Sequence, residues 1–198
     1  MRRTELLQKF KEGAIFLQEV SFYSTKFFQY ASFHAATFDD KSETLFLETE
    51  FKGEVDFSYS LLKGYVVFEG KFGKPVFVGK DAFLNFQNAR LENTERVRFK
   101  NVRLRPNWFV NMDSRKLIFH DVDWENANGN FKTTREGLQL LQRREITGRP
   151  HRLLAITCRQ LAVNTEENNH FEQASNFRRM AMELSLLGKK LISIWLCR

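Results

Sequence analysis

The stretch Ala31-Ser-Phe-His-Ala-Ala-Thr-Phe38 places two phenylalanines five residues apart, each two residues after an alanine. The same spacing of five recurs on both sides of it, in the pairs Phe22 and Phe27, Phe46 and Phe51, and Phe72 and Phe77. A strand alternates every two residues and a helix repeats every 3.6, so neither explains this period. A period of five requires a backbone that turns a corner every fifth residue and points one large side chain per side at a common axis. The sequence therefore predicts a solenoid.

A small or β-branched residue precedes many of the large ones by two positions, for example Val20, Ala31, Val55 and Val97. Residues two apart on an extended segment share a face, so we expect both to point inward. A β-sandwich, the alternative, would space apolar residues by two and four. The large side chains expected in the core are Phe22, Phe33, Phe38, Phe51, Phe57, Phe68, Phe99, Leu104 and Trp124.

Four of these stretches resemble the pentapeptide-repeat family: Val20-Ser-Phe-Tyr-Ser24, Ala31-Ser-Phe-His-Ala35, Val55-Asp-Phe-Ser-Tyr59 and Val97-Arg-Phe-Lys-Asn101. The resemblance covers roughly residues 15–126. It implies an all-β solenoid, a right-handed quadrilateral β-helix with four repeats to a coil and about five coils here. The spacing slips to six between Phe51 and Phe57, and residues 70–81 keep the small position poorly. We expect a bulged corner or loop in that segment.

After Trp124 the pattern becomes helical. Thr133 and Glu136 have capping-box spacing and start a helix that Gly148 and Pro150 end. A second helix is expected over about 152–164, and a third from Asn169 to a stop near Gly188. The predicted domains are an N-terminal capping helix (1–14), the β-helix (15–132) and a C-terminal helical cap (133–198) that covers the solenoid end or stands as a small bundle.

Part of this C-terminal region has a resemblance of its own. The stretches Thr157–Leu161, Asn169–Phe177 and Met180–Glu183 are similar to a segment of bacterial membrane-associated pentapeptide-repeat proteins, with Cys158 in place of the usual tyrosine. Longer relatives continue into transmembrane helices. Residues 184–198 are too few for that, since a bilayer core of ~30 Å needs about 20 apolar residues. Three interpretations stay open: a remnant of a membrane region, an amphipathic tail on a membrane surface, or a tail packed on the helices.

The charge is uneven. The chain carries a net charge of +7, and residues 134–198 hold 11 Lys and Arg against 6 Asp and Glu. The candidate interaction surface is therefore basic: Lys71, Lys74, Lys80, Arg143, Arg144, Arg149 and Arg152. No aromatic-interleaved basic stripe or known motif points to nucleic acid. DNA mimicry, as in family members that bind DNA gyrase, requires an acidic rod, and the positive charge argues against it.

Catalytic patterns are missing from the sequence. The segment Gly73–Asp81 has five residues between its first and last glycines where a phosphate-binding loop has four, and Asp81 stands where a Ser or Thr is required. The four histidines share no metal-ligand spacing with each other or with Cys158 and Cys197, whose pairing stays open. The segment Trp108–Lys116 departs most from the repeat. Two interpretations stay open for it: a recognition loop, or a corner insertion packed on the helices.

We therefore expect no enzymatic activity, no cofactor and no metal. The expected function is that of a protein-interaction scaffold with a protein partner that the sequence does not identify. The alternative is the soluble domain of a membrane-associated or channel-type protein. The N-terminal 13 residues lack the apolar region of a secretory signal, so the expected location is cytoplasmic, or peripheral to the inner face of the membrane through residues 184–198.

Overall fold

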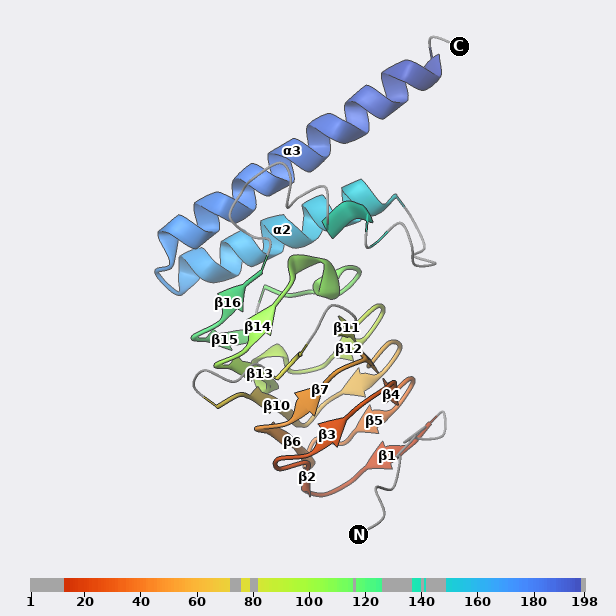
Figure 1. Ribbon diagram of the computed structural model, residues 1–198, viewed down its shortest axis with the longest axis vertical. Coiled ribbons are helices and arrows are strands. Elements are labelled where there is room, and N and C mark those ends of the chain that lie inside the picture. Colours follow the sequence, from red (N-terminus) through yellow and green to blue (C-terminus); the bar gives the residue numbers. More distant parts are fainter. Residues whose placement is uncertain are drawn as a thin grey trace. The chain divides into compact units, whose positions relative to one another are not determined.

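The computed structural model describes residues 13–71, 76–78, 82–115, 117–125, 137–139, 141 and 149–196, the last eight of them by backbone only (Figure 1). The chain divides into two compact units. The strand unit comprises Met1–Leu104 and Lys116–Asp123, and the helical unit comprises Arg105–Arg115 and Trp124–Arg198. Of the expected N-terminal helix (1–14), residues 1–12 lie outside the described residues, and Gly13 lies in a turn with φ +84°.

Short parallel strands form the strand unit, and we number its main sheets I to IV. Sheet I contains β1 (Ile15–Phe16), β5 (Thr37–Phe38), β9 (Leu61–Leu62) and β12 (Arg90–Leu91). Sheet II contains β2 (Val20–Ser21), β6 (Glu43–Leu47), β10 (Tyr65–Glu69), β13 (Val97–Lys100) and β15 (Ile118–His120). Sheet III contains β3 (Lys26–Phe27) and β7 (Glu50–Phe51), and sheet IV contains β4 (Ala31–Ser32), β8 (Glu54–Asp56) and β11 (Phe83–Asn85). A further pair joins β14 (Arg103–Leu104) to β16 (Asp123–Trp124).

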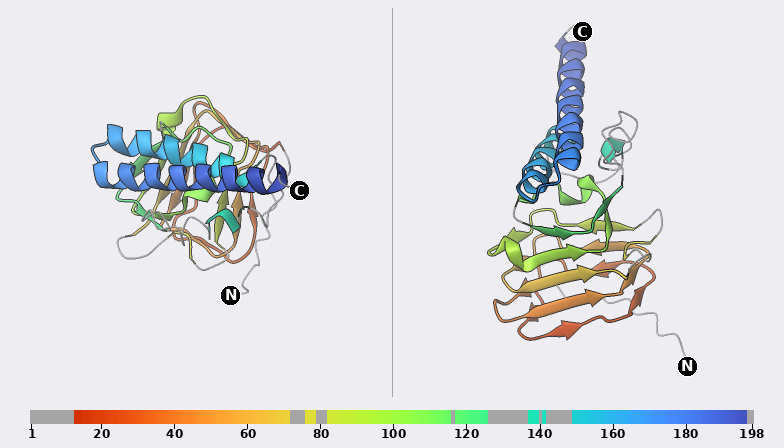
Figure 2. Two further views of the ribbon diagram at one scale, coloured as in Figure 1. Left: turned by 90° about the horizontal axis from the view of Figure 1, so that it is seen from above. Right: turned by 90° about the vertical axis from the view of Figure 1, so that its left-hand side faces the viewer.

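The chain enters sheets I, II, III and IV in that order and then begins again, and we call each such passage a circuit. Strands β1 to β4 form the first circuit and β5 to β8 the second. In the third, the bridge between Phe77 and Phe51 takes the place of a sheet III strand. Figure 2 shows the strands of successive circuits stacked side by side. Many short parallel strands in this order are compatible with a β-rich solenoid.

Phenylalanine rings fill the interior in columns, one ring per circuit. Behind sheet II, Phe22, Phe46, Phe68, Phe99 and Phe119 stack in turn, with centroids 5.0, 4.8, 5.1 and 5.5 Å apart. Behind sheet IV, Phe57 stacks on Phe33 at 4.7 Å and on Phe86 at 5.2 Å. Rings of neighbouring columns meet edge to face, as Phe46 and Phe57 do at 89°. Both geometries are favourable for aromatic rings, so phenylalanine suits the positions in these two columns.

The core residues expected from the sequence are buried. Relative exposure is 0% for Phe33, Phe38, Phe51, Phe57, Phe68, Phe99 and Leu104, 8% for Trp124 and 9% for Phe22. The small positions are buried with them, as Ala31 (1%) and Val55 (0%) show. The length of a circuit, however, is not a constant 20 residues. In-register phenylalanines of sheet II differ by 24, 22, 31 and 20 residues, because the corners vary in length.

Left-handed residues mark two of the four corners. Among the described residues of the strand unit, seven other than glycine have φ between +50° and +58°, each two positions after a column phenylalanine: Ser24, Glu48, Asn101 and Asp121 after sheet II, and Ala35, Tyr59 and Asn88 after sheet IV. Asparagine tolerates this conformation, whereas Ala, Tyr and Glu do not favour it. The ladder of backbone hydrogen bonds, for example Ala35 N–H to the Ser58 carbonyl at 2.9 Å, holds these corners in place.

In the helical unit, α2 (Pro150–Glu167) and α3 (Phe171–Leu196) form a hairpin. Proline at the first turn of α2 suits a helix start because that N–H has no partner within the helix. The expectation that Gly188 ends α3 is wrong. A β-carbon there would lie 2.6 Å from the His151 ring, so the glycine admits a close helix contact and the helix continues. Of the first predicted helix, residues 137–139 and 141 are helical, and its cap at Thr133 lies outside the described residues.

The link between these helices differs from the expected cap. Asn169 was expected to cap α3, but it adopts φ +63° and ends α2 instead. The Asn169 N–H donates to the Glu166 carbonyl at 3.0 Å, and the His170 N–H donates to the Thr165 carbonyl at 2.8 Å. This pair of bonds is a Schellman motif, in which asparagine takes the left-handed position more often occupied by glycine.

The segment that departs from the repeat packs on α2. Residues Pro106–Phe109 form the 3-10 helix η2, and Trp108 and Ser114 are 3% and 0% exposed. Asn164 on α2 donates its side-chain amide to the carbonyls of Ser114 (3.2 Å) and Arg115 (2.8 Å). These contacts support a corner insertion packed on the helices and not a recognition loop. In the described part of the chain, no helix has an apolar stretch long enough to cross a bilayer.

Candidate interaction surface

The basic surface expected from the sequence is only partly described. Lys74, Lys80, Arg143 and Arg144 lie outside the described residues. Lys71 is exposed in the strand unit, with its Nζ 3.8 Å from Glu48 Oε2. Arg149 and Arg152 are exposed at the start of α2, in the helical unit. The described members therefore belong to two different units, Lys71 to the strand unit and Arg149 and Arg152 to the helical unit.

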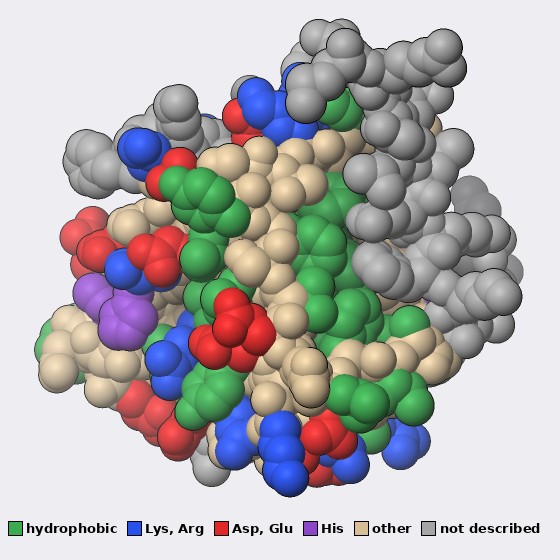
Figure 3. Space-filling view, turned by 90° about the horizontal axis from the view of Figure 1, so that it is seen from below, with side chains coloured by type: hydrophobic (Ala, Val, Ile, Leu, Met, Phe, Trp, Pro, Cys, Tyr) green, Lys and Arg blue, Asp and Glu red, His purple; other side chains and the backbone are tan. Residues whose placement is uncertain are grey.

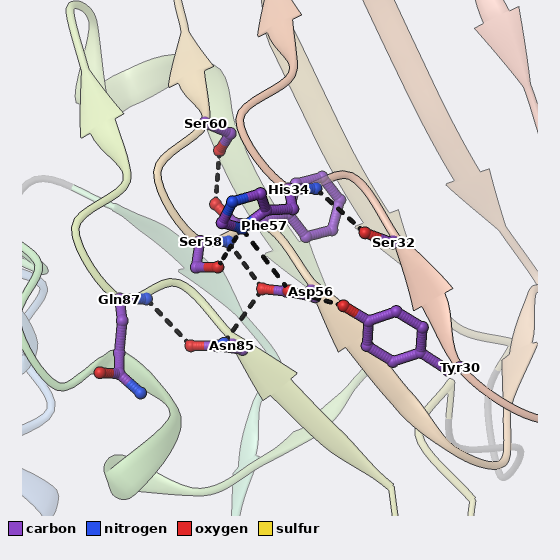
Figure 4. Close-up of polar contacts among 9 residues, drawn as sticks. All are labelled: Tyr30, Ser32, His34, Asp56, Phe57, Ser58, Ser60, Asn85 and Gln87. Carbon is purple, nitrogen blue, oxygen red and sulfur yellow. Dashed lines mark hydrogen bonds and ion pairs between the residues drawn. The ribbon is translucent and has the colours of Figure 1, made fainter. Parts of the chain in front are cut away.

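Polar side chains on the outer face of sheet IV form a hydrogen-bonded cluster (Figure 4). We define the sheet IV wall as residues 29–35, 53–59 and 82–88, which contain β4, β8 and β11 with their flanking corners. Ser32, Asp56 and Asn85 lie in register across its three strands. Each stands between two inward residues, a column phenylalanine after it and Ala31, Val55 or Leu84 before it, and therefore points outward.

These three side chains shape their own corners. Each accepts the backbone N–H two residues further on: Ser32 Oγ from His34 at 3.4 Å, Asp56 Oδ1 from Ser58 at 2.9 Å and Asn85 Oδ1 from Gln87 at 3.1 Å. Short polar side chains commonly stabilise turns in this way. The left-handed residue of each corner comes next, so the wall repeats one local structure three times.

Asp56 is the centre of the cluster. Its side chain is 11% exposed. Tyr30 Oη donates to Oδ2 at 2.7 Å, and Asn85 Nδ2 donates to Oδ1 at 3.0 Å. Burial raises the pKa of Tyr30 to about 12, and the hydrogen bond to Asp56 and the negative charges of Asp56 and Glu54 act in the same direction. The tyrosine hydroxyl is thus held protonated as a donor to the carboxylate.

His34 lies beside this carboxylate, and Tyr59 contacts the His34 ring. His34 Nδ1 lies 2.9 Å from Ser58 Oγ and 3.9 Å from Asp56 Oδ2, and the His34 and Tyr59 rings meet at 64° with centroids 5.6 Å apart. A Ser-His-Asp triad needs the serine and the carboxylate on opposite ring nitrogens. Here both oxygens face Nδ1, so the arrangement is built for holding side chains in place and not for nucleophilic attack.

The wall is acidic and aromatic on a basic protein. Its 21 residues include Glu54 and Asp56 but no Lys or Arg, although the chain has 31 of these. Tyr30 and Tyr59 are 40% and 60% exposed. Gly53 lets the second circuit approach the first at this wall, because a β-carbon there would lie 2.5 Å from the Gln29 carbonyl oxygen. The close approach keeps Tyr30 within reach of Asp56.

Sequence reasoning missed this surface because it looked for clusters of basic residues. The signal lay in the polar positions of the repeat, where Ser32, Asp56 and Asn85 occur 24 and 29 residues apart. Those separations are recognisable only after the strand register is known. The outward polar residues were predicted as a class, but their hydrogen bonding to one another was not.

A second exposed feature is the outermost strand of each sheet, in the first circuit. Large apolar or aromatic side chains between 40% and 64% exposed lie in these strands or within two residues of them: Ile15, Leu17, Tyr23, Phe28 and Tyr30. Figure 3 views the molecule from below and shows hydrophobic side chains lying among acidic and basic ones. Lys52 Nζ, for example, lies 4.7 Å from the centre of the Phe28 ring. Because residues 1–12, which precede this edge, lie outside the described part, we assign it no ligand.

Reactive groups elsewhere are few in the described residues. No group of three His, Cys, Asp or Glu side chains among them is placed to hold a metal ion. Cys158 is a free thiol inside the helical hairpin, and burial raises its pKa to about 12. A thiol with so high a pKa is a poor nucleophile at neutral pH.

Comparison of the chain with protein-family models, with curated proteins and with solved structures found no match. The resemblance to the pentapeptide-repeat family therefore rests on the repeat itself and stays a prediction.

Proposed function

We propose that this chain is a cytoplasmic pentapeptide-repeat protein, a right-handed quadrilateral β-helix of about five coils with a C-terminal helical cap, and that it acts as a non-enzymatic scaffold for a protein partner. The fixed order in which the chain enters the four sheets supports the coiled topology. The columns of stacked phenylalanines support a rigid core. A rigid core leaves the outward positions free to vary, which suits binding.

The proposed contact surface is the sheet IV wall, and one observation carries it: aromatic side chains there are exposed and held in place. Tyr30 is fixed by its hydrogen bond to Asp56, and Tyr59 is in ring contact with His34. Tyrosine is enriched among the residues that dominate binding energy at protein interfaces. Side chains that are already ordered lose less conformational entropy on binding.

Site-specific photocrosslinking in the native host tests this proposal. A photoreactive phenylalanine analogue at Tyr59 should form a covalent adduct with a discrete partner. Tyr23 is the matched control, because it is a tyrosine of nearly equal exposure (63% against 60%) that follows sheet II. Adducts of the same pattern from both positions, or none from Tyr59, would contradict the sheet IV wall as the contact surface.

A second candidate function is that of the soluble part of a membrane-associated protein. The observation that favours it is the length of α3, which continues past Gly188 through the apolar stretch Leu191-Ile192-Ser193-Ile194-Trp195-Leu196. Flotation of the full chain with anionic vesicles, compared with the variant Ile192→Glu, tests this function. Flotation that depends on Ile192 would favour it, and equal recovery of both proteins in the unbound fraction would remove it.

A further inference from the structure

We infer that the sheet IV wall binds a cationic side chain, preferably arginine, that the partner presents to Asp56. This inference rests on the proposed function and names the chemistry of its contact. Its starting point is the charge of Asp56. No Lys or Arg among the described residues lies within 4.0 Å of this carboxylate, which is only 11% exposed, and its three hydrogen-bond donors are all neutral. Nearly buried carboxylates are usually paired with a cation, because desolvation of a charge is costly.

One lone-pair position of the carboxylate has no donor among the described residues within hydrogen-bond distance. An ionised carboxylate offers about four lone-pair positions. Two on Oδ1 are taken by the Ser58 N–H and by Asn85 Nδ2, and one on Oδ2 is taken by Tyr30. His34 Nδ1, 3.9 Å from Oδ2, lies outside hydrogen-bond distance and leaves the last position open. A single N–H donor from outside the protein would complete the set.

The surroundings of that position favour a planar cation. Tyr30 and His34 lie beside the carboxylate, Tyr59 is in ring contact with His34, and both tyrosines are exposed. Cations are attracted to ring faces, and a guanidinium group stacks on them while it donates N–H bonds at its edge. An anionic ligand is disfavoured, because the 21 wall residues carry two carboxylates and no Lys or Arg. A metal ion would need further ligands that the wall lacks.

Fluorescence anisotropy with a labelled peptide, Gly-Arg-Gly-Arg-Gly, tests the inference on the full chain. The same peptide with citrulline in place of arginine keeps the shape and removes the charge. We expect Asp56→Asn to weaken binding of the arginine peptide about tenfold or more, as loss of a hydrogen bond to a charged group does. The citrulline peptide should bind wild-type protein about tenfold more weakly.

Glu69→Gln is the matched control. It changes the net charge by the same amount, but Glu69 lies on sheet II and is bound to Lys100 Nζ at 2.8 Å. It should leave peptide affinity within about twofold, since distant surface charges are screened by salt. Equal losses from Asp56→Asn and Glu69→Gln would show attraction to net charge alone and overturn the inference.

Tyr59→Ala is the second variant, because it touches none of the hydrogen bonds of Asp56 and keeps the test valid if Asp56→Asn unfolds. It should also weaken the arginine peptide, and an unchanged affinity would contradict the aromatic part of the site. A citrulline peptide that binds as tightly as the arginine peptide would refute cation recognition. If photocrosslinking at Tyr59 still captures a partner in that case, only the inference fails and the proposed function stands.

Discussion

Replacement of Phe57 by alanine gives the sharpest test of the aromatic core. Phe57 is fully buried, stacks between Phe33 and Phe86, and meets Phe46 and Phe68 edge to face. A buried Phe→Ala change costs about 3–5 kcal/mol of unfolding free energy. We expect a cost of about 4–5 kcal/mol here, because the surrounding rings cannot move into the void without breaking their own stacks.

Two further variants separate the contributions. Phe57→Leu keeps most of the buried area and loses the four stacked and edge-to-face ring contacts, each worth about 0.5–1.5 kcal/mol. Its cost should therefore be at least about 2 kcal/mol and smaller than that of Phe57→Ala. Leucine is already present in the core at Leu62, in register with Phe38. Phe28→Ala is the control, since that ring is 58% exposed and contacts Lys52, and its cost should stay below about 1 kcal/mol.

Urea denaturation followed by intrinsic fluorescence measures these costs unit by unit. All four tyrosines belong to the strand unit and all three tryptophans to the helical unit. With a urea slope of about 1–2 kcal/mol per M, Phe57→Ala should lower the tyrosine-reported midpoint by about 2–5 M. A loss below about 1 kcal/mol for Phe57→Ala, or equal losses for Phe57→Ala and Phe28→Ala, would refute the column arrangement.

Three other outcomes are expected. Ala35→Gly should leave the free energy of unfolding unchanged or raise it by up to about 1 kcal/mol, because Ala35 has φ +53°. Ala36 is buried and has no positive φ, so Ala36→Gly should lower the free energy of unfolding by about 1 kcal/mol or more. Thermal melts compare the two variants. Asn164→Ala should cost about 2–3 kcal/mol by tryptophan-monitored urea denaturation, since it leaves two carbonyls without their donor. The pKa of Tyr30 rises from 10.0 to about 12 on folding, so the stability that its neutral form supports is present below pH 10 and is lost between pH 10 and 12. The melting temperature of Tyr30→Phe should therefore fall less than that of the wild-type protein over that interval. An equal fall in both proteins would contradict the shift.

The core was predictable from the sequence because it depends on side-chain size at a short period. Phe33 and Phe38 are five residues apart, and one corner separates their strands, so the local pattern alone gives the inward positions. Register between circuits was not predictable. It depends on corner length, as at residues 39–42, where Ser42 Oγ donates to the Asp39 carbonyl and the corner is longer than the repeat allows. The polar cluster depends on that register and was missed with it.

The predicted helix ends at Gly188 and Asn169 were wrong for a related reason. Gly188 and Asn169 both have the sequence character of a helix boundary, but each is decided by a contact that the sequence does not show. Gly188 stays helical because His151 packs against it, and Asn169 ends α2 because its left-handed conformation completes hydrogen bonds to the preceding turn. Local propensity gives the candidates for such positions, and tertiary packing or the hydrogen-bond partner selects among them.

The sheet IV wall also shows why net charge is a poor predictor of the interaction surface. A charge of +7 describes long-range attraction, whereas a contact is decided by the few groups that lose water on binding. Asp56 is such a group, because most of its desolvation has already occurred in the folded chain. A cation that reaches Oδ2 therefore gains an interaction in a poorly solvated environment, while exposed pairs such as Lys71 with Glu48 remain screened by water and salt. Binding at the sheet IV wall should accordingly lose less affinity with added salt than binding at the exposed basic residues would.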